Sequence, residues 1–263
     1  MGQPSRSNGT PTYRWNIALG FRVVRSAVAV AQTEQPETKA AAPTVQQEQE
    51  QRAAEAAAAR YNPVVRDAAA FAQAISALNS ERTGGTYTIT LTGSINADPV
   101  VFTSNAAKTI ILKGDDNPRT MRNNGSRALF TVPSGITLVL DNNISLNGND
   151  KQAVIVAVDG GTLIMKTGSA LYGAGKNGVS LNNRASFTMQ GGDIGDNSAN
   201  EKGGGVCVAS GTLSKRNRGT IDDTNSAREG KVAYVYSSRQ RNTTAGPGVT
   251  LNSNIAGGSG GWE

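Results

Sequence analysis

Histidine is missing from all 263 residues of this chain. It is the usual proton shuttle near neutral pH and the commonest metal ligand among side chains. Its absence excludes Ser-His-Asp and Cys-His catalysis and every zinc site that needs an imidazole. Only carboxylate, lysine, tyrosine or arginine chemistry could operate here. We therefore predict no catalytic residue, no metal and no cofactor, and a chain that is not an enzyme.

Cysteine is almost as scarce, because Cys207 is the single one. One cysteine cannot close an intramolecular disulfide, and there is no cysteine-rich metal motif. Cys207 lies in the apolar run 205–208 (GVCV), where a small strand residue is expected to be buried or half-buried. No helix N-terminus or neighbouring positive charge is predicted to activate the thiol, so we expect a structural role.

Aromatic residues make up only 5% of the chain, whereas glycine occurs 31 times. Asparagine and serine are also frequent. Glycine and asparagine tolerate left-handed backbone conformations, so their abundance indicates many tight turns. This composition favours a fold of many short strands over a helical one.

The net charge of +6 is concentrated towards the two ends of the chain. Residues 1–27 contain four arginines and no acid, and residues 211–241 are also rich in lysine and arginine. A nucleic-acid-binding protein would more often line one continuous face with basic and aromatic side chains. We predict solvated loop charge and no nucleic-acid partner, with an anionic polymer or headgroup as the alternative.

No run of about 18 apolar residues is present, so no transmembrane helix is predicted. Residues 17–31 end in an Ala-Val-Ala-Val-Ala stretch that superficially suggests a signal cleavage site. Arg22 and Arg25 interrupt its hydrophobic core, and we do not interpret it as a signal peptide.

The first segment, residues 1–27, carries the string 20–25 (GFRVVR) after residues 11–14 (PTYR). These strings resemble the closing strand of the formylglycine-generating enzyme (sulfatase-modifying factor) family. The catalytic cysteines and metal ligands of that family lie upstream of this motif, so the resemblance implies no catalytic residue here. We interpret the segment as the remnant of such a domain, a short strand without its sheet.

Residues 28–61 form an Ala/Gln/Glu-rich stretch that contains Pro36 and Pro43. Residues 45–60 are predicted to be a polar helix with no apolar stripe, which is typical of a solvated linker.

A helix is expected over about residues 64–80, where Phe71, Ile75 and Leu78 fall at i, i+4 and i+7. An apolar stripe of this kind suits a helix that caps the open end of a strand stack. After Gly84 the pattern changes to the alternation of strands.

From Lys108 onward one strand pattern recurs at near-constant spacing. Its copies are residues 109–113, 137–141, 162–166, 186–190 and 212–216. Their starts are separated by 28, 25, 24 and 26 residues. Each unit also carries a second short apolar strand, at residues 129–132, 154–158, 179–181, 206–208 and 234–236.

This periodicity predicts that residues 62–263 form an all-β solenoid, a single-stranded parallel β-helix. No unit can bury its inward side chains alone, so the units must stack. About seven or eight rungs at ~4.8 Å each would make a rod roughly 35 Å long. A β-sandwich would also have many short strands, but it does not require a fixed period.

Residues 203–212 (GGGVCVASGT) and 186–194 (SFTMQGGDI) resemble the rungs of bacterial right-handed β-helix surface proteins. Residues 234–248 and 260–263 resemble the end of the same group. The resemblance implies right-handed coiling and an adhesin-like protein that is secreted or held at the cell surface or outer membrane. The strand pattern fades at residues 214–230, where we expect a departure from the family.

Some β-helices are pectate lyases or polygalacturonases, so paired acids are candidate catalytic groups. The only adjacent pairs are Asp115-Asp116 and Asp222-Asp223. The polygalacturonase pattern also needs a third aspartate, a histidine and an Arg-x-Lys, which do not occur in order. We interpret both pairs as turn residues.

Residues 191–197 (GGDIGDN) partly match the nonapeptides that bind calcium in parallel β-rolls. Such sites need consecutive copies so that neighbouring turns share each ion, and only one copy is present. Residues 173–175 (GAG) are no phosphate loop, since no Gly-Lys-Ser/Thr follows.

These observations predict a non-catalytic bacterial surface or secreted module whose long faces bind glycan or a host or neighbouring protein. Two alternatives remain open. One is a polysaccharide lyase or hydrolase that acts through aspartate and arginine on one face. The other is the C-terminal fragment of a formylglycine-generating-enzyme-type protein.

Overall fold

The computed structural model describes residues 62–215, 219–236, 241–242 and 255–256. All of them belong to one compact unit, Pro43–Glu263. The predicted remnant at 1–27 and the linker at 28–61 lie outside the described residues. So do most of the residues after 236 that carry part of the resemblance to surface proteins.

The described residues form three parallel sheets, which we call A, B and C. Sheet A consists, in spatial order, of β1 Val64–Val65, β2 Gly85–Leu91, β5 Lys108–Gly114, β8 Ile136–Leu140, β11 Thr162–Met165, β14 Ala185–Met189, β17 Gly211–Lys215 and β20 Arg241–Asn242. Sheet B consists of β3 Ile95–Ala97, β6 Arg119–Asn123, β9 Ile144–Asn147, β12 Ser169–Tyr172, β15 Asp193–Gly195 and β18 Thr220–Ile221. Sheet C consists of β4 Val100–Val101, β7 Phe130–Pro133, β10 Val156–Asp159, β13 Val179–Asn182, β16 Val206–Val208, β19 Ala233–Val235 and β21 Ile255–Ala256.

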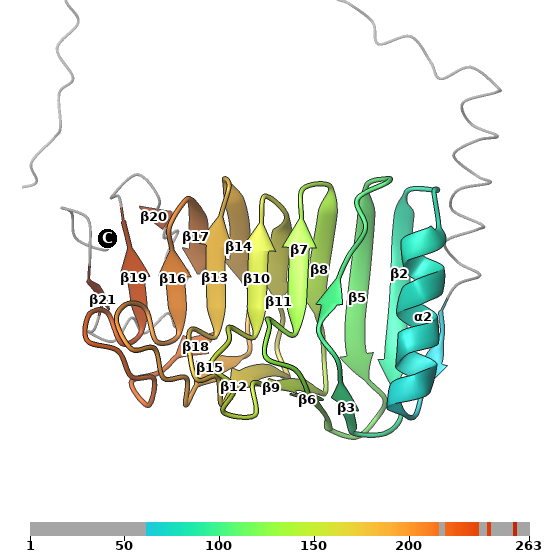
Figure 1. Ribbon diagram of the computed structural model, residues 1–263, viewed down its shortest axis with the longest axis horizontal. Coiled ribbons are helices and arrows are strands. Elements are labelled where there is room, and N and C mark those ends of the chain that lie inside the picture. The colour runs from blue at the N-terminus through green and yellow to red at the C-terminus, as the bar shows by residue number, and fades with distance from the viewer. Residues whose placement is uncertain (1–61, 216–218, 237–240, 243–254, 257–263) are drawn as a thin grey trace, which may run out of the picture. The chain divides into compact units, whose positions relative to one another are not determined.

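The chain visits sheets A, B and C in turn and then returns to A one level further along (Figure 1). Strands that pair are therefore one coil apart in sequence, and pairings such as β8 with β11 and β10 with β13 are parallel. This arrangement confirms the predicted parallel β-helix and excludes an antiparallel sandwich. The strands of sheets A and C that the repeat predicts are present.

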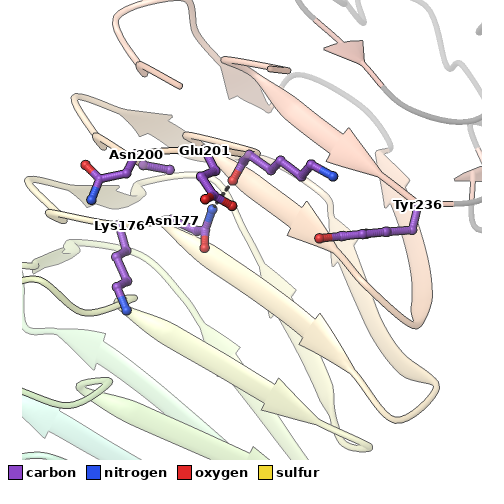
Figure 2. Close-up of a pocket in the computed structure, with 7 residues that line it drawn as sticks. Lys176, Asn177, Asn200, Glu201 and Tyr236 are labelled. Atoms are coloured by element: carbon purple, nitrogen blue, oxygen red, sulfur yellow. Dashed lines mark hydrogen bonds between the residues drawn. The ribbon is translucent and has the colours of Figure 1, made fainter. Parts of the chain in front are cut away.

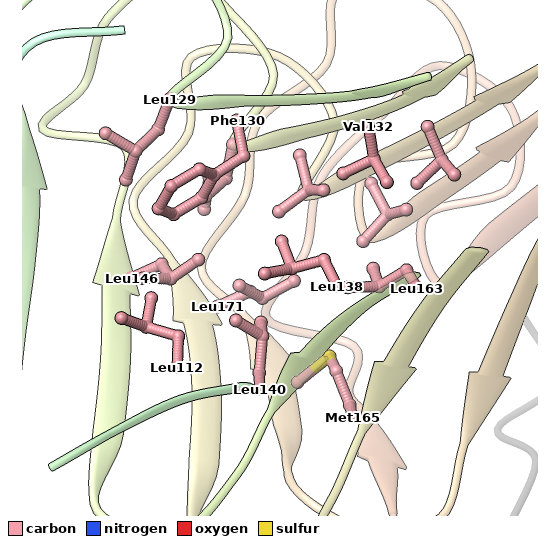
Figure 3. Close-up of a cluster of buried hydrophobic side chains, with 14 of the residues drawn as sticks. Leu112, Leu129, Phe130, Val132, Leu138, Leu140, Leu146, Leu163, Met165 and Leu171 are labelled. Atoms are coloured by element: carbon pink, nitrogen blue, oxygen red, sulfur yellow. The ribbon is translucent and has the colours of Figure 1, made fainter. Parts of the chain in front are cut away.

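Register places equivalent side chains directly above one another. In sheet A, one inward ladder is Tyr87, Ile110, Leu138, Leu163, Phe187 and Leu213. In sheet B, the inward ladder is Ile95, Met121, Leu146, Leu171, Ile194 and Ile221. Each of these side chains is at most 5% exposed. Together with those of sheet C they fill the interior of the coil, as Figure 3 shows for its middle part.

The strands of sheet B were not identified in the repeat, although they complete every coil. β9 and β12 have four residues each, like β10 and β13 of sheet C, but β15 has three residues and β18 only two. A strand this short shows a single inward apolar residue, such as Ile194 or Ile221, and no alternation. The recurrence of one aliphatic residue a few positions after each sheet A strand is the signal that could have revealed them.

A helix, α2 Ala68–Ser80, closes the N-terminal end of the stack (Figure 1). Asp67 is its N-cap and accepts a 2.8 Å hydrogen bond from the backbone N–H of Ala70. The predicted stripe is buried, and Phe71 meets the ring of Phe130 edge to face, with centroids 6.3 Å apart. In the described part of the chain, no helix has the length and apolar character needed to span a bilayer.

The helix begins at Ala68 and not near residue 64 as expected. Val64 and Val65 form the strand β1, which pairs with Thr90 and Leu91 of β2. Two β-branched residues are well suited to pair with the end strand of a sheet, and Asp67 then starts the helix. The edge of sheet A is extended by a strand before the helix covers the interior.

The coil also continues over the described residues between 214 and 230, where the strand pattern fades. Ile194 pairs with Ile221, and Val206 pairs with Ala233. Between these strands the interior is filled partly by Asn225, which is 1% exposed. A buried asparagine occupies this interior position, as Asn197 does one coil earlier, so the apolar pattern weakens while the coil persists.

Adjacent residues of β11 allow a direct test of which side chains face inward. Leu163 is fully buried and Ile164 lies on the outer face. Leu163→Ala should lower the free energy of unfolding by about 2–5 kcal/mol, because it leaves a cavity in the core. Ile164→Ala removes a side chain of the same size and should cost less than about 1.5 kcal/mol. Urea unfolding of both variants measures this, and equal losses would contradict the assignment.

Candidate functional site

The two aspartate pairs considered as catalytic groups are not brought together. Asp115 follows β5 in sheet A, whereas Asp222 follows β18 in sheet B. The two strands lie four coils apart, which corresponds to roughly 19 Å along the axis at the usual strand spacing. A pair of cooperating carboxylates cannot be formed from residues so far apart. Each aspartate instead serves its own turn.

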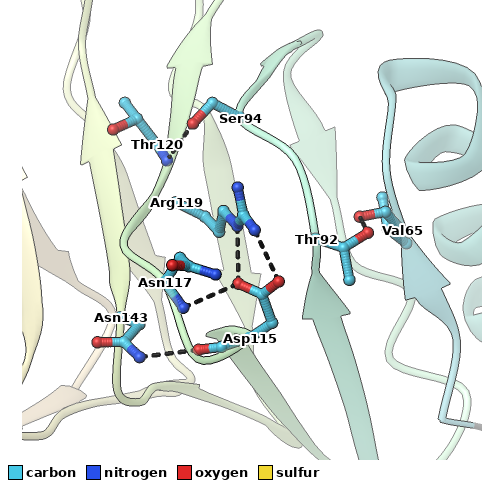
Figure 4. A network of polar contacts seen from close by, with 8 residues as sticks. All are labelled: Val65, Thr92, Ser94, Asp115, Asn117, Arg119, Thr120 and Asn143. Carbon is cyan, nitrogen blue, oxygen red and sulfur yellow. Dashed lines mark hydrogen bonds and ion pairs between the residues drawn. The ribbon is translucent and has the colours of Figure 1, made fainter.

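Asp115 forms a two-pronged ion pair with Arg119 at the start of β6 (Figure 4). The Nε and Nη2 atoms of Arg119 each donate a 2.7 Å hydrogen bond to the carboxylate. The backbone N–H of Asn117 also donates to it, at 3.1 Å, and the Asn143 side chain donates to the Asp115 carbonyl at 2.8 Å. The contact with Arg119 lowers the pKa of Asp115 from 3.8 to about 2. The carboxylate is therefore held ionised within its own turn, and the Asp115 backbone carbonyl joins that turn to Asn143 of the next coil.

We predict that Arg119→Gln raises the pKa of Asp115 from about 2 towards 3.8. Since the folded state lowers this pKa, the ion pair stabilises the fold at pH values above the unfolded pKa. That contribution is lost as the pH falls towards about 2. The titration of the Asp115 carboxyl carbon, followed by NMR, measures the change. Arg122→Gln, at an exposed position of the same strand, should leave the titration where it is, and a shift as large as that of Arg119→Gln would contradict the assignment.

Asp222 caps the turn after β18. Its carboxylate accepts a 2.9 Å hydrogen bond from the backbone N–H of Thr224 and another from the Thr224 hydroxyl. Its own N–H donates to the carbonyl of Ile194 in the previous coil. These are the contacts of an aspartate that shapes a turn.

The calcium-like segment 191–197 is used to build the coil. Asp193 is exposed on β15, Asp196 has a left-handed backbone with φ 53°, and Asn197 is completely buried. Asn197 accepts a 3.0 Å hydrogen bond from the N–H of Ala174 and donates to the side chain of Asn225, one coil further on, at 3.0 Å. Among the residues that the structure describes, no three acidic, cysteine or histidine side chains form a group that could hold a metal.

Asn197→Ala should lower the free energy of unfolding by about 1–3 kcal/mol, because it leaves buried polar partners in two neighbouring coils without a hydrogen bond. Asn200→Ala is the matched control, since Asn200 is exposed, and should change it by no more than about 0.5 kcal/mol. Chemical denaturation of the two variants gives the comparison. A loss that is the same in both would show that the Asn197–Asn225 contact contributes nothing.

A hollow of about 330 Å³ lies where the loops between sheets B and C meet the end of β19 (Figure 2). It is lined by Lys176, Asn177, Ala199, Asn200, Glu201, Lys202 and Tyr236. These residues come from the loops before β13 and β16 and from the residue after β19, so three successive coils contribute. Lys176, Asn200 and Glu201 are exposed. None of these residues was singled out in the sequence.

Tyr236 is the aromatic residue that lines the hollow, and Tyr234 lies against it. Their rings meet edge to face with centroids 5.0 Å apart. The Nζ atom of Lys202 lies 4.6 Å from the centroid of Tyr234 and 4.8 Å from that of Tyr236, within cation–π range of both rings. Tyr236 is 54% exposed, which is unusual for so large a side chain. The hydrogen bond with Tyr234 raises the pKa of Lys202, so its ammonium group remains charged at neutral pH.

Hydrogen bonds to neighbouring coils fix the loop that carries Glu201 and Lys202. The Asn177 side chain donates to the carbonyl of Lys202 at 2.6 Å, and the N–H of Gly203 donates to the carbonyl of Glu229 at 3.0 Å. Lys202 and Glu229 also form a parallel bridge between successive loops. Gly203 has φ +66°, a left-handed conformation that favours glycine. The loop that carries Glu201 and Lys202 is thus fixed from both sides.

Cys207 lies next to this hollow, on the outer face of β16. It pairs with Ser180 on one side and Tyr234 on the other, and it is half-buried as predicted. Burial raises the pKa of its thiol, which outweighs the opposite effect of Lys202. The thiol therefore stays protonated at neutral pH and is a poor nucleophile.

Comparisons with known protein families, curated proteins and solved structures found no match to this chain. The resemblances to surface β-helix proteins and to formylglycine-generating enzymes stay predictions.

Proposed function

We propose that this protein is a non-catalytic module at the exterior of a bacterium, displayed on the cell or secreted, and that it binds glycans in the hollow beside Tyr236. The observation that supports this is an exposed tyrosine and a charged lysine facing several exposed polar side chains across one concave surface. Binding sites commonly combine an apolar platform with a few convergent polar groups.

A sugar has two kinds of surface, and the hollow offers a counterpart for each. The C–H face of a pyranose can pack on an aromatic ring such as Tyr236, whose phenol remains available for hydrogen bonding. Its hydroxyl groups can bond to the amide of Asn200 and the carboxylate of Glu201, which are both exposed. Lys202 adds a fixed positive charge, which would favour acidic sugars.

The same geometry argues against a lyase or hydrolase. A general base works best when its pKa lies near the operating pH. The pKa of Lys202 is raised, so it holds its proton. The pKa of Asp115 is about 2 and its carboxylate is already bound to Arg119, so it is a weak base. These properties favour binding over catalysis.

The proposal of an external location rests on the repeat pattern and its resemblance to surface β-helix proteins. The alternative of a formylglycine-generating-enzyme fragment depends on residues 1–27. The solenoid by itself can be a binding module.

A glycan array probed with the full-length chain tests the proposal. We expect retention of at least one class of glycan, weakened about tenfold in Tyr236→Ala, because a central aromatic contact typically contributes more than 1 kcal/mol to binding. Tyr172→Ala is the matched control, since Tyr172 lies half-buried on sheet B, outside the hollow, and should bind like the wild type.

Two outcomes would contradict the proposal. The wild-type chain could retain no glycan above background, or Tyr172→Ala could weaken binding as much as Tyr236→Ala. Incubating the protein with uronate and neutral polysaccharides checks the rival activity, because a shortened polymer would show that the protein is an enzyme.

A further inference from the structure

A second hollow, of about 310 Å³, lies at the opposite end of sheet C from the hollow beside Tyr236. One wall is the side of α2 that carries Ala72 and Ser76, and the other is formed by residues 98–101, which include β4. Sheet C extends without a break from β4 to β19, the strand that Tyr236 follows (Figure 1). One face of the solenoid therefore joins the two hollows.

The outward row on this face has small side chains between its two ends. The row is Val101, Thr131, Ala157, Ser180, Cys207 and Tyr234. Its four middle members are no larger than threonine. Val101, at one end, is 60% exposed, and Tyr236, which lies against Tyr234 at the other end, is 54% exposed. Large exposed side chains thus lie at the two ends of the face and leave its middle low.

Larger side chains project from the middle of the other two faces. The outer face of sheet B carries Arg122 and Tyr172, which lie on either side of Asn147 in one row. The outer face of sheet A carries the ion pair between Asp141 and Lys166. The low middle is therefore a property of sheet C and not a general result of the coiling.

A second outward row on sheet C supplies polar groups that are held in position. It includes Pro133, Asp159 and Asn182, which are paired in register. The exposed carboxylate of Asp159 accepts a hydrogen bond from the Asn183 side chain, and the Asn182 side chain donates to the Ser180 hydroxyl at 3.3 Å. Side chains that are already fixed lose little conformational entropy when they bind a ligand.

The loops between sheets B and C, which border this face, carry charges of both signs in nearly equal numbers. The basic residues are Arg127, Lys151, Lys176, Lys202, Arg228 and Lys231, and the acidic ones are Asp98, Asp150, Asp196, Glu201, Asp222, Asp223 and Glu229. This mixture provides no continuous positive strip for a nucleic acid.

An extended peptide is also a poor match to the face. Such peptides commonly bind by adding a strand to a free sheet edge. The strands from β7 to β19 are paired on both sides, so their backbone groups point along the sheet and not outward. A chain rich in hydroxyl groups fits better, because it can bond to the outward hydroxyl, amide and carboxylate groups.

We infer that the glycan bound in the hollow beside Tyr236 is a linear chain of several sugar units, which lies along the outer face of sheet C towards the hollow at β4. The inference rests on the proposed glycan function and deepens it. Five strand spacings separate β19 from β4, so the face offers about 24 Å of contact along the axis. A single sugar occupies only the hollow at Tyr236, whereas a longer chain also contacts the polar middle of the face. Long solenoid faces are suited to extended ligands.

The test is the dependence of affinity on the length of the glycan, measured by isothermal titration calorimetry with the full-length chain. The probes are linear gluco-oligosaccharides, linear oligogalacturonates and the corresponding series of any further class that the glycan array shows to be retained. We expect the affinity to increase about tenfold from the disaccharide to chains long enough to cover the face, because added units gain contacts without a new loss of translational freedom. Tyr236→Ala should weaken the binding of every length.

The double variant Ala157→Ile with Ser180→Ile places two rigid side chains in the middle of the face and removes a hydroxyl group. It should lose the increase with length and bind the shortest oligosaccharide like the wild type. The matched control is Ser145→Ile with Ala170→Ile, which makes the same changes at two paired positions on the outer face of sheet B. It should keep the increase. Isoleucine is well suited to strands, and circular dichroism and thermal unfolding establish that both variants are folded.

The possible failures separate the inference from the function on which it rests. Equal affinity for all lengths would overturn the inference and leave the glycan site at Tyr236 in place. The inference would also be overturned if the sheet B variant lost as much of the increase as the sheet C variant. If no oligosaccharide of any length bound and the array retained no glycan, the proposed function itself would be overturned, and the inference with it.

Discussion

The structure depends on one constraint, which is that no coil can satisfy its own backbone or bury its own apolar side chains. Each strand pairs with the equivalent strand of the coil before and the coil after, and its inward side chain packs between theirs. Stacking in a single register is therefore the source of both the hydrogen bonding and the core. The other features of the molecule either follow from this register or lie on the outer surface of the coil.

The register also governs the polar parts of the coil. Asn197 hydrogen-bonds to Asn225 one coil further on, as buried leucines pack above one another elsewhere. Asn143 and Asn183 adopt left-handed backbone conformations at turns, where asparagine is tolerated. Asp115 and Arg119, four residues apart, close one turn within a coil, and the Asn143 side chain joins that turn to the next coil. In the sequence, these acidic and amide residues were considered for catalysis or calcium binding. In the structure, most of them form hydrogen bonds within turns or between coils.

Because the inside is so strongly constrained, function is left to the outward positions and the loops. Alternate residues of each strand point outward, so the outer rows can change without disturbing the core. The loops between sheets B and C vary in length, and they place Glu201 and Lys202 near Tyr236, which follows β19, around one hollow. The outer face of sheet A carries rows of threonine and aliphatic side chains beside the Asp141–Lys166 ion pair.

The sequence by itself determined the parallel β-helix, the helix that closes its N-terminal end and the structural position of Cys207. It could do so because inward residues such as Leu138, Leu163 and Phe187 recur at a period that stacking requires. It did not reveal the strands of sheet B, of which β15 and β18 carry a single inward aliphatic residue each. Nor could it reveal the hollow, because Asn177, Lys202 and Tyr236 are far apart in sequence and meet only when three coils are stacked. The local sequence pattern predicts where the residues of a repeat lie, whereas a site formed by several coils exists only in the tertiary structure.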